Sequence, residues 1–148
     1  MPELPEVEVV KKSLKKKISN LIFKKVLIYT NKLRYTLNKK DLKKIENKKI
    51  ISIYRRSKYL ILNFNNNLSL IIHLGMTGKL ILENKKKIKS KTSFYFNLKK
   101  NDNKHNHIVF LLSKKNKLIF NDVRKFGFVE VDKSDNLINN KHIKYLGP

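Results

Sequence analysis

The chain has 148 residues, with 35 lysines and arginines against 11 aspartates and glutamates, for a formal net charge of +24. Its length suits one domain with a sizeable core, and its charge predicts nucleic acid as a partner. No apolar run is long enough to span a bilayer, and acidic residues stand where a signal peptide would be basic. We therefore expect a cytoplasmic protein with no membrane partner. The absence of cysteine excludes disulfides, thiol catalysis and a cysteine-based zinc site within these residues.

Arginine is scarce in this lysine-rich sequence. Lysine scattered among asparagine and isoleucine is typical of a sequence drifting toward A·T-rich codons, so we assign much of the charge to a solvated surface. The planar guanidinium suits bidentate contacts with phosphates and bases better than lysine does, so the arginines are the more informative cations. They are Arg34, Arg55, Arg56 and Arg124.

Apolar residues recur at helical spacing near the start of the chain and predict an amphipathic helix from Pro5 to about Ile18. Acidic residues occupy its first turn and lysines its last turn, which complements the helix dipole. Because Glu6 lies in the first turn, we predict that it interacts with the helix dipole and acts as a positioning residue. The apolar face comprises Val7, Val10, Leu14 and Ile18.

After Asn20 the pattern changes to short apolar runs bounded by polar residues, which is typical of antiparallel strands. We predict an α+β fold in which the N-terminal helix packs on an antiparallel two-sheet β-sandwich, in one domain over residues 1–148. A short helix over 41–47, a hairpin turn at 65–67 and lysine-rich loops over 84–91 and 99–106 lie between strands. The predicted strands are 21–29, 50–54, 59–64, 68–74, 79–82, 93–98, 107–112, 118–120 and 128–131.

The opening residues Met1-Pro2-Glu3 offer a reactive amine. Removal of Met1 would expose the secondary amine of Pro2, and an α-amino group has a pKa of roughly 7.7 to 8.0, well below that of lysine. It can attack a carbon at neutral pH and form a covalent iminium intermediate. Glu3 is a candidate for proton transfer beside it. Proline at this position is also common in proteins without such chemistry. The motifs downstream must therefore show whether Pro2 is a reactive amine or part of an ordinary helix start.

The segment Arg55-Arg56-Ser57-Lys58 joins two predicted strands. Basic residues at such a strand edge most often contact phosphate or form a solvated rim. We name Arg56 and Lys58 as candidate site residues.

The segment His73-Leu74-Gly75-Met76-Thr77-Gly78 ends an apolar strand with a glycine-flanked methionine. Met76 either packs into the core beside a tight turn or projects from a thin loop as a wedge between stacked bases.

The segment Asn121-Asp122-Val123-Arg124-Lys125-Phe126-Gly127 places an arginine and an aromatic residue two positions apart. Taken alone, it predicts a strand with a surface charge and a core phenylalanine. Taken with Met76, it predicts that Arg124 and Phe126 complete an intercalating trio.

The segment Lys104-His105-Asn106-His107 contains two histidines at alternate positions. No third ligand lies close in sequence and the surroundings are basic, so we predict no metal site. His105 is given a structural or phosphate-contacting role.

These motifs, together with Pro-Glu-Leu-Pro-Glu-Val-Glu at residues 2–8, resemble the formamidopyrimidine-DNA glycosylase family of bifunctional repair enzymes. The resemblance covers essentially all of this chain and implies the N-terminal domain of the formamidopyrimidine-DNA glycosylase/endonuclease VIII type. It implies a monomer that acts on double-stranded DNA, excises oxidised purines such as 8-oxoguanine and formamidopyrimidines, and then cuts the strand as an AP lyase.

The resemblance assigns catalytic roles to three residues. Pro2 forms a Schiff base at the sugar C1′, Glu3 acts as acid and base, and Lys58 assists proton transfer near the damaged nucleotide. The iminium acidifies the C2′ protons, so β-elimination and then δ-elimination follow.

The resemblance also implies contacts with DNA. Met76 fills the space left by the extruded nucleotide, Arg124 bonds the orphaned base, Phe126 stacks on its neighbours and His73 contacts a phosphate. The full set of predicted DNA-binding residues is Arg56, His73, Met76, His105, Arg124 and Phe126.

The chain departs from the family pattern in two ways. Val123 and Lys125 stand where the family has proline and a second arginine, which loosens the loop and weakens a phosphate contact. We also expect the family's helix-two-turns-helix domain and four-cysteine zinc finger to lie outside this chain, so the chain itself needs no cofactor while the family binds one zinc ion in that finger.

Two alternatives stay open. The endonuclease VIII branch acts on oxidised pyrimidines, but it usually has glycine in place of Leu4 and lacks the same wedge sequence. A truncated, non-catalytic domain that binds nucleic acid through its charge is the other alternative.

Overall fold

The computed structural model describes residues 4–84, 92–93, 103–144 and 146. Within these ranges the chain forms two α-helices, nine strands and three short 3-10 helices. The elements used below are α1 (Leu4–Ile18), β1 (Ile22–Ile28), α2 (Lys39–Lys43), β2 (Lys48–Arg56), β3 (Tyr59–Phe64), β4 (Leu68–His73), β5 (Gly78–Asn84), β6 (Thr92–Ser93), β7 (Asn106–Leu112), β8 (Asn116–Asp122) and β9 (Phe128–Lys133). None of the described helices is long and apolar enough to cross a membrane.

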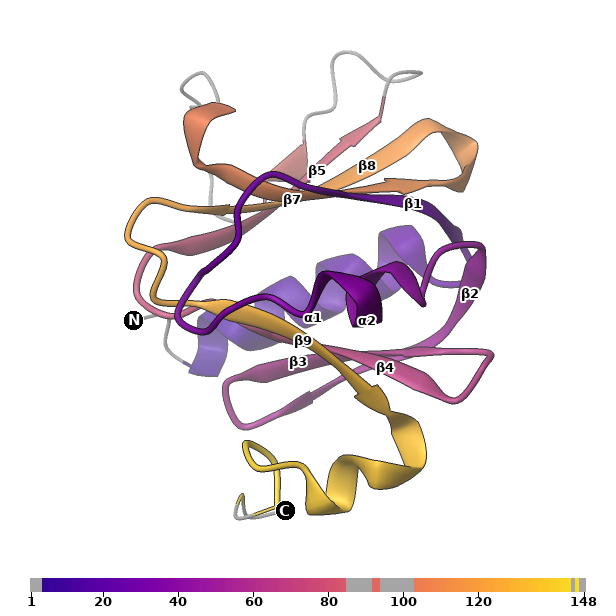
Figure 1. The fold of residues 1–148 in the computed structure, drawn as a ribbon. Helices are drawn as coiled ribbons and strands as arrows, with labels where there is room; N and C mark the ends of the chain where they lie inside the picture. The colour runs from indigo at the N-terminus through magenta and orange to yellow at the C-terminus, as the bar shows by residue number, and fades with distance from the viewer. Residues whose placement is uncertain (1–3, 85–91, 94–102, 145, 147–148) are drawn as a thin grey trace.

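The strands pair in the order β6-β5-β8-β7-β1-β2-β3-β4-β9, and every pair is antiparallel. The link between β1 and β2 consists of two residue pairs, Ile22 with Lys49 and Phe23 with Lys48. The order bends at this short link, so that β5, β8, β7 and β1 lie over β2, β3, β4 and β9 (Figure 1). The predicted α+β fold, with an N-terminal helix and antiparallel strands, is confirmed.

One apolar core fills the space between the two groups of strands. The Phe23 ring of β1 meets the Phe64 ring of β3 edge to face at 5.0 Å between ring centroids, and the tilted Phe110 ring of β7 lies 5.2 Å away. All three rings are buried. Aromatic pairs in this geometry add to the stabilisation that burial alone provides, so strands from both groups are held by the same cluster.

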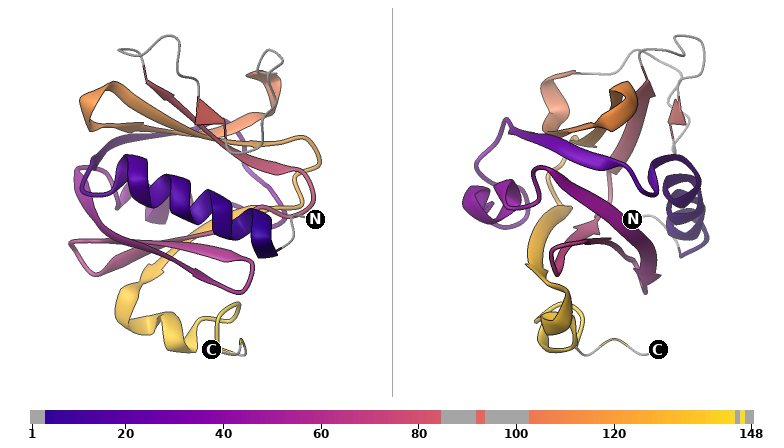
Figure 2. Two further views of the ribbon diagram at one scale, coloured as in Figure 1. Left: turned by 180° about the vertical axis from the view of Figure 1, so that it is seen from behind. Right: turned by 90° about the vertical axis from the view of Figure 1, so that its right-hand side faces the viewer.

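Helix α1 closes one side of this core, and α2 lies on the opposite side (Figure 2). The predicted apolar face of α1 is confirmed, because Val7, Val10, Leu14 and Ile18 expose no more than 1% of their surface. The helix begins at Leu4 and ends at Ile18, within one residue of the prediction.

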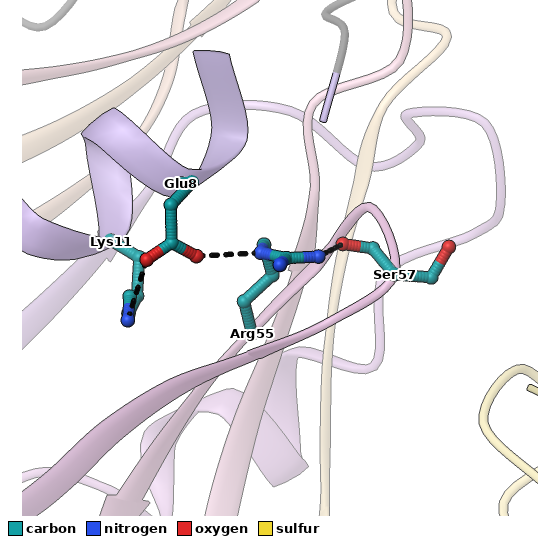
Figure 3. Close-up of polar contacts among 4 residues, drawn as sticks. All are labelled: Glu8, Lys11, Arg55 and Ser57. Atoms are coloured by element: carbon teal, nitrogen blue, oxygen red, sulfur yellow. Dashed lines mark hydrogen bonds and ion pairs between the residues drawn. The ribbon is translucent and has the colours of Figure 1, made fainter. Parts of the chain in front are cut away.

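An ion pair holds the second turn of α1 to the end of β2 (Figure 3). The Arg55 Nε donates to Glu8 Oε1 at 2.7 Å, and Arg55 Nη1 donates to the Ser57 carbonyl at 3.0 Å. Lys11 pairs with the other Glu8 oxygen at 2.8 Å. The bond from Arg55, followed by that from Lys11, lowers the pKa of Glu8 from 4.5 to about 2. Helix α1 is therefore held to the hairpin that carries Lys58.

The second helix differs from its prediction. It spans Lys39–Lys43 rather than 41–47, because the Asn38 side chain accepts a hydrogen bond from Asp41 N at 3.0 Å and caps the helix earlier. Asn47, with φ of +65°, stands in the turn before β2. The predicted turn at 65–67 is confirmed, with Asn67 at φ of +63° between β3 and β4.

The remaining strand predictions agree with the structure except at one place. Of the strand predicted over 93–98, Ser93 belongs to β6 and the rest lies outside the described residues. The sequence did not reveal the 3-10 helix Ser134–Asn139 or the turn that follows it. That segment packs Leu137 and Ile143 against Ile61 and Ile71, on the face of β3 and β4 turned away from the main core.

The low pKa of Glu8 predicts how the stability of this chain depends on pH. The ionised carboxylate is stabilised in the folded state, so its contribution is complete above pH 4.5 and is lost as the pH falls toward 2. Wild type should be more stable than Glu8→Gln at pH 6, and the gap should close by about pH 2. Urea unfolding at both pH values measures this. Glu6→Gln, on an exposed residue of the same helix, controls for the loss of one carboxylate. A gap of equal size at both pH values would contradict the prediction.

Candidate functional site

A buried carboxylate joins the two loops that carry the predicted wedge residues. Asp122, at the end of β8, is fully buried. Its Oδ1 accepts a hydrogen bond from Thr77 Oγ1 at 2.5 Å and one from Arg124 N at 3.3 Å. Its Oδ2 accepts one from Gly127 N at 2.9 Å. We call residues 74–77 the methionine loop and residues 123–127 the arginine loop. Asp122 holds the two in a fixed relation.

The two loops also touch through their backbones. Gly75 has a φ of +64°, and a Cβ on it would lie 2.5 Å from Gly127 N. A Cβ on Gly127 would lie 2.5 Å from the His73 carbonyl oxygen. No side chain fits in either gap, so glycine is required at both positions for the loops to approach this closely.

Three side chains predicted from two separate motifs meet on the surface of these loops. Met76 and Phe126 are 48% and 47% exposed, so the alternative that they are core residues is wrong. Arg124 lies between them, with its Nη1 3.8 Å from Met76 Sδ and its Cζ 5.5 Å from the centre of the Phe126 ring. The guanidinium over the ring is a cation–π contact. We call Met76, Arg124 and Phe126 the exposed trio.

A depression of about 640 Å³ opens beside the exposed trio. It lies between the methionine loop, the arginine loop and the segment that connects β1 to α2. Leu33 and Arg34 come from that segment, and no sequence motif assigned them to a site; the scarcity of arginine was the available signal for Arg34. The lining residues are Leu33, Arg34, Gly75, Met76, Arg124, Lys125 and Phe126.

His73 lies beneath the methionine loop at the end of β4. Its ring is buried, stacks on Phe128 at 5.5 Å and packs against Tyr59 at 4.8 Å. Its Nδ1 accepts a hydrogen bond from Gly75 N at 3.1 Å. Burial, with the nearby positive charges of Arg34, His142 and Lys58, lowers the pKa of His73 to about 4. A neutral His73 therefore supports the loop at neutral pH, and its contact with phosphate stays a prediction.

The β2–β3 turn brings Lys58 to the same end of the sheet as His73. Ser57 takes a φ of +51° in this turn, and Tyr59 of β3 pairs directly with His73 of β4. The Lys58 charge is one of those that act on His73. Arg56 points elsewhere, since its Nη2 donates to the Leu146 carbonyl at 3.3 Å.

Two of the predicted catalytic residues, Pro2 and Glu3, lie outside the described residues. Glu6 is exposed in the first turn of α1. The ion pair of Glu8 with Arg55 holds α1 against the β2–β3 hairpin, which carries Lys58.

The two histidines of the 104–107 segment have different environments. His107 is buried and its Nε2 donates to the Asp122 carbonyl at 2.7 Å, so it supports the base of the arginine loop. Burial is the main cause that lowers the pKa of His107, and the charges of Lys125 and His105 add to it. His105 is partly exposed in the short helix before β7.

Metal binding finds no support in the part of the chain that the structure describes. No three His, Asp or Glu side chains gather there into a group that could hold an ion, and the whole sequence lacks cysteine.

Comparison with known proteins gives a consistent result. Residues 1–129 match the family model described as the formamidopyrimidine-DNA glycosylase N-terminal domain. A formamidopyrimidine-DNA glycosylase from Rickettsia bellii is 47% identical over 130 residues, which are 87% of this chain and 42% of that protein. The chain belongs to the formamidopyrimidine-DNA glycosylase family.

Solved structures agree with this assignment. A crystal structure of wild-type Lactococcus lactis Fpg with DNA containing N7-benzyl-Fapy-dG superposes with a TM-score of 0.77 at 32% identity, over 99% of this chain and 49% of that one. Another, of the same wild-type protein with DNA containing an oxidised pyrimidine, has a TM-score of 0.73 at 31% identity, over 93% and 47%. The chain thus spans about half the length of the relatives it matches.

The hydrogen bonds of Asp122 predict a specific cost for its replacement. Asp122→Asn keeps the size of the side chain but places an amide among donors, so at least one of the bonds from Thr77, Arg124 and Gly127 is lost. We expect a loss of about 1–3 kcal/mol in the free energy of unfolding, with faster amide exchange at Gly127. Asp135→Asn, on an exposed carboxylate, should cost much less. Equal losses in the two variants, measured by urea unfolding, would refute the role given to Asp122.

Proposed function

We propose that this chain is the N-terminal catalytic part of a base-excision DNA glycosylase with AP lyase activity, acting on oxidised purines in double-stranded DNA. The observation that carries the proposal is the exposed trio. An exposed methionine, arginine and phenylalanine held together by a buried carboxylate suit insertion into a base stack and have no evident use in a free surface.

Extrusion of the nucleotide is the first step. A protein amine cannot reach the sugar C1′ of a stacked base, so the damaged nucleotide must leave the helix at a cost of a few kcal/mol. Met76 enters the space it vacates, Phe126 stacks on adjoining bases and Arg124 bonds the orphaned partner base. Because Asp122 and the glycine contacts fix the loops before DNA arrives, little ordering entropy opposes insertion.

Covalent catalysis follows. The Pro2 nitrogen attacks C1′, the C1′–base bond breaks and the base departs with the bonding electrons and a proton. Glu3 supplies and accepts protons as the sugar ring opens, and Lys58 contacts the DNA and assists this transfer. The iminium then loses a C2′ proton, the 3′ phosphate leaves in β-elimination, and δ-elimination releases the 5′ phosphate.

Substrate range is the point on which the alternatives differ. The wedge sequence favours the purine branch. The Lactococcus lactis protein solved with DNA containing an oxidised pyrimidine makes the endonuclease VIII-like alternative worth testing in the same experiment. Loss of catalysis with retention of charge-driven binding is the remaining alternative.

Borohydride trapping tests the chemistry. Protein processed to remove Met1 should form a covalent adduct with duplex containing 8-oxoguanine, because borohydride reduces the iminium to a stable amine. Peptide mapping should place the adduct on Pro2. Duplexes with guanine, an oxidised pyrimidine or an abasic site in the same position serve as controls.

Each result of this assay selects one hypothesis. A strong adduct with the oxidised pyrimidine and none with 8-oxoguanine would favour the pyrimidine branch. Binding to every duplex without any adduct, including the abasic one, would leave the non-catalytic hypothesis. Because relatives are about twice as long, we expect residues 1–148 alone to bind weakly with strong salt dependence and to turn over little. Trapping is therefore measured with excess protein at low salt, where a single covalent event without turnover gives the adduct.

The exposed trio gives a second prediction. Phe126→Ala should lose about 1–3 kcal/mol in binding to duplex with an abasic analogue, the usual value of stacking on an aromatic side chain. Its fold should survive because the ring is 47% exposed. Val123→Ala, in the same loop and 53% exposed, is the matched control. Fluorescence anisotropy titrations should separate the two variants; the same affinity for both would contradict an intercalating role.

A further inference from the structure

The outer face of β3, β4 and β9, which is turned away from the main core, is covered by a segment that follows β9. We call residues 134–144 the covering segment (yellow in Figure 1). Strand pairing places Tyr59, His73 and Phe128 in one row across this face, with His73 in the middle. Directly opposite residues of antiparallel strands share a face. The histidine that supports the methionine loop therefore belongs to the surface that the covering segment covers.

Two kinds of contact fix the covering segment in place. Its Leu137 and Ile143 make the apolar contacts with β3 and β4 described above. The side chain of Asn140, which is 4% exposed, donates to Asp132 Oδ2 of β9 at 2.9 Å and accepts from His142 N at 2.8 Å. The same amide thus binds a strand and the turn that carries His142, so the position of His142 on the face is set.

The ring of His142 packs on the row that contains His73. Its centre lies 4.6 Å from that of Phe128 and 6.1 Å from that of Tyr59. Each of these two rings also contacts His73, at 5.5 Å and 4.8 Å. Tyr35, from the segment between β1 and α2, adds a contact at 5.5 Å. The His142 side chain is only 12% exposed, so its loss would leave a gap beside both rings that hold His73.

Ring packing, rather than an ion pair, is the main interaction of His142. Its Nε2 lies 3.4 Å from Glu130 Oε2. Burial, followed by the charges of Lys141 and Arg34, lowers the pKa of His142, and burial raises the pKa of Glu130. The imidazole is therefore neutral at pH 7, and its contact with the carboxylate lacks the attraction between two opposite charges.

We propose that His142 is a positioning residue for the exposed trio. Its ring holds Phe128 and Tyr59 against His73. The His73 Nδ1 in turn accepts the Gly75 N–H at the start of the methionine loop, so a displaced His73 ring would lose this bond and release the loop. The family model matches residues 1–129, so this role belongs to a residue beyond the matched part. The inference rests on the proposed function for the use of the trio.

Met76 supplies the probe for the test. The chain has two methionines, and processing removes Met1, so a ¹³C label on methionine methyl groups reports on Met76 alone. His142→Gln removes the ring but keeps a hydrogen-bond donor near Glu130, whereas His142→Phe keeps a ring and loses the donor. Val10→Ala, on the buried face of α1, is the control for a general loss of stability.

Without DNA, His142→Gln should shift and broaden the Met76 methyl signal, because the methionine loop then exchanges between conformations. It should also weaken binding to duplex with an abasic analogue by about 2- to 30-fold, the usual range for a substitution in a network that couples two sites. His142→Phe should restore the signal and the affinity. Val10→Ala should lower the midpoint of urea unfolding and change neither of them.

Either an unchanged Met76 signal or an unchanged affinity in His142→Gln would overturn the inference. So would equal effects of His142→Gln and His142→Phe, since the ring would then not be the cause, or an equal effect of Val10→Ala, since lost stability alone would then move the loop. Failure of the proposed function is distinct: wild type would bind abasic and intact duplex equally and form no borohydride adduct, while the methyl signals of the free variants would still differ as expected.

Discussion

The carboxylate of Asp122 is the constraint on which the candidate site depends. A buried carboxylate is costly unless it is fully hydrogen-bonded, and Thr77, Arg124 N and Gly127 N satisfy it here from both loops. Release of either loop would leave the carboxylate with missing partners inside the protein. Loss of the fixed geometry of the exposed trio would therefore also destabilise the fold, because both depend on the Asp122 carboxylate.

The strands supply the frame for this arrangement. Gly78 and Asp122 face each other in the β5–β8 pair, so the methionine loop and the arginine loop leave the sheet side by side. His107 of β7 bonds the Asp122 carbonyl from behind, and His73 of β4 bonds Gly75. The loops are thus supported from both groups of strands. A shift of one group against the other would therefore move the loops that form the surface where DNA is proposed to bind.

Local pattern predicted much of the fold. The apolar face of α1 and most strands follow from periodicity, because burial on one side repeats at the period of each element. The start of α2 depended on the cap at Asn38, a side-chain bond that periodicity does not contain. The segment with Leu137 and Ile143 was missed because short 3-10 turns have no repeat long enough to detect.

Part of the candidate site was predictable from the sequence, but the contacts that connect its residues were not. The motifs named Met76, Arg124 and Phe126, and the structure brings them together. Neither the role of Asp122 nor the nearness of Arg34 follows from sequence spacing, since Arg34 lies 93 positions before Gly127, the residue whose carbonyl it bonds. Contacts between distant segments are set by how the strands pair, which a single sequence does not specify.

The close backbone approach of the two loops also bears on how this sequence can drift. The chain has four glycines, and three of them, Gly75, Gly78 and Gly127, lie where an added Cβ would meet backbone at 2.5 Å or less. Glycine codons begin with two guanines, so a bias toward A·T-rich codons works directly against them. Exposed positions with no assigned role can accept lysine, asparagine or isoleucine, whereas these glycine positions cannot accept a side chain. We therefore expect substitutions toward A·T-rich codons to be excluded at these glycines, because a side chain there would clash with the backbone.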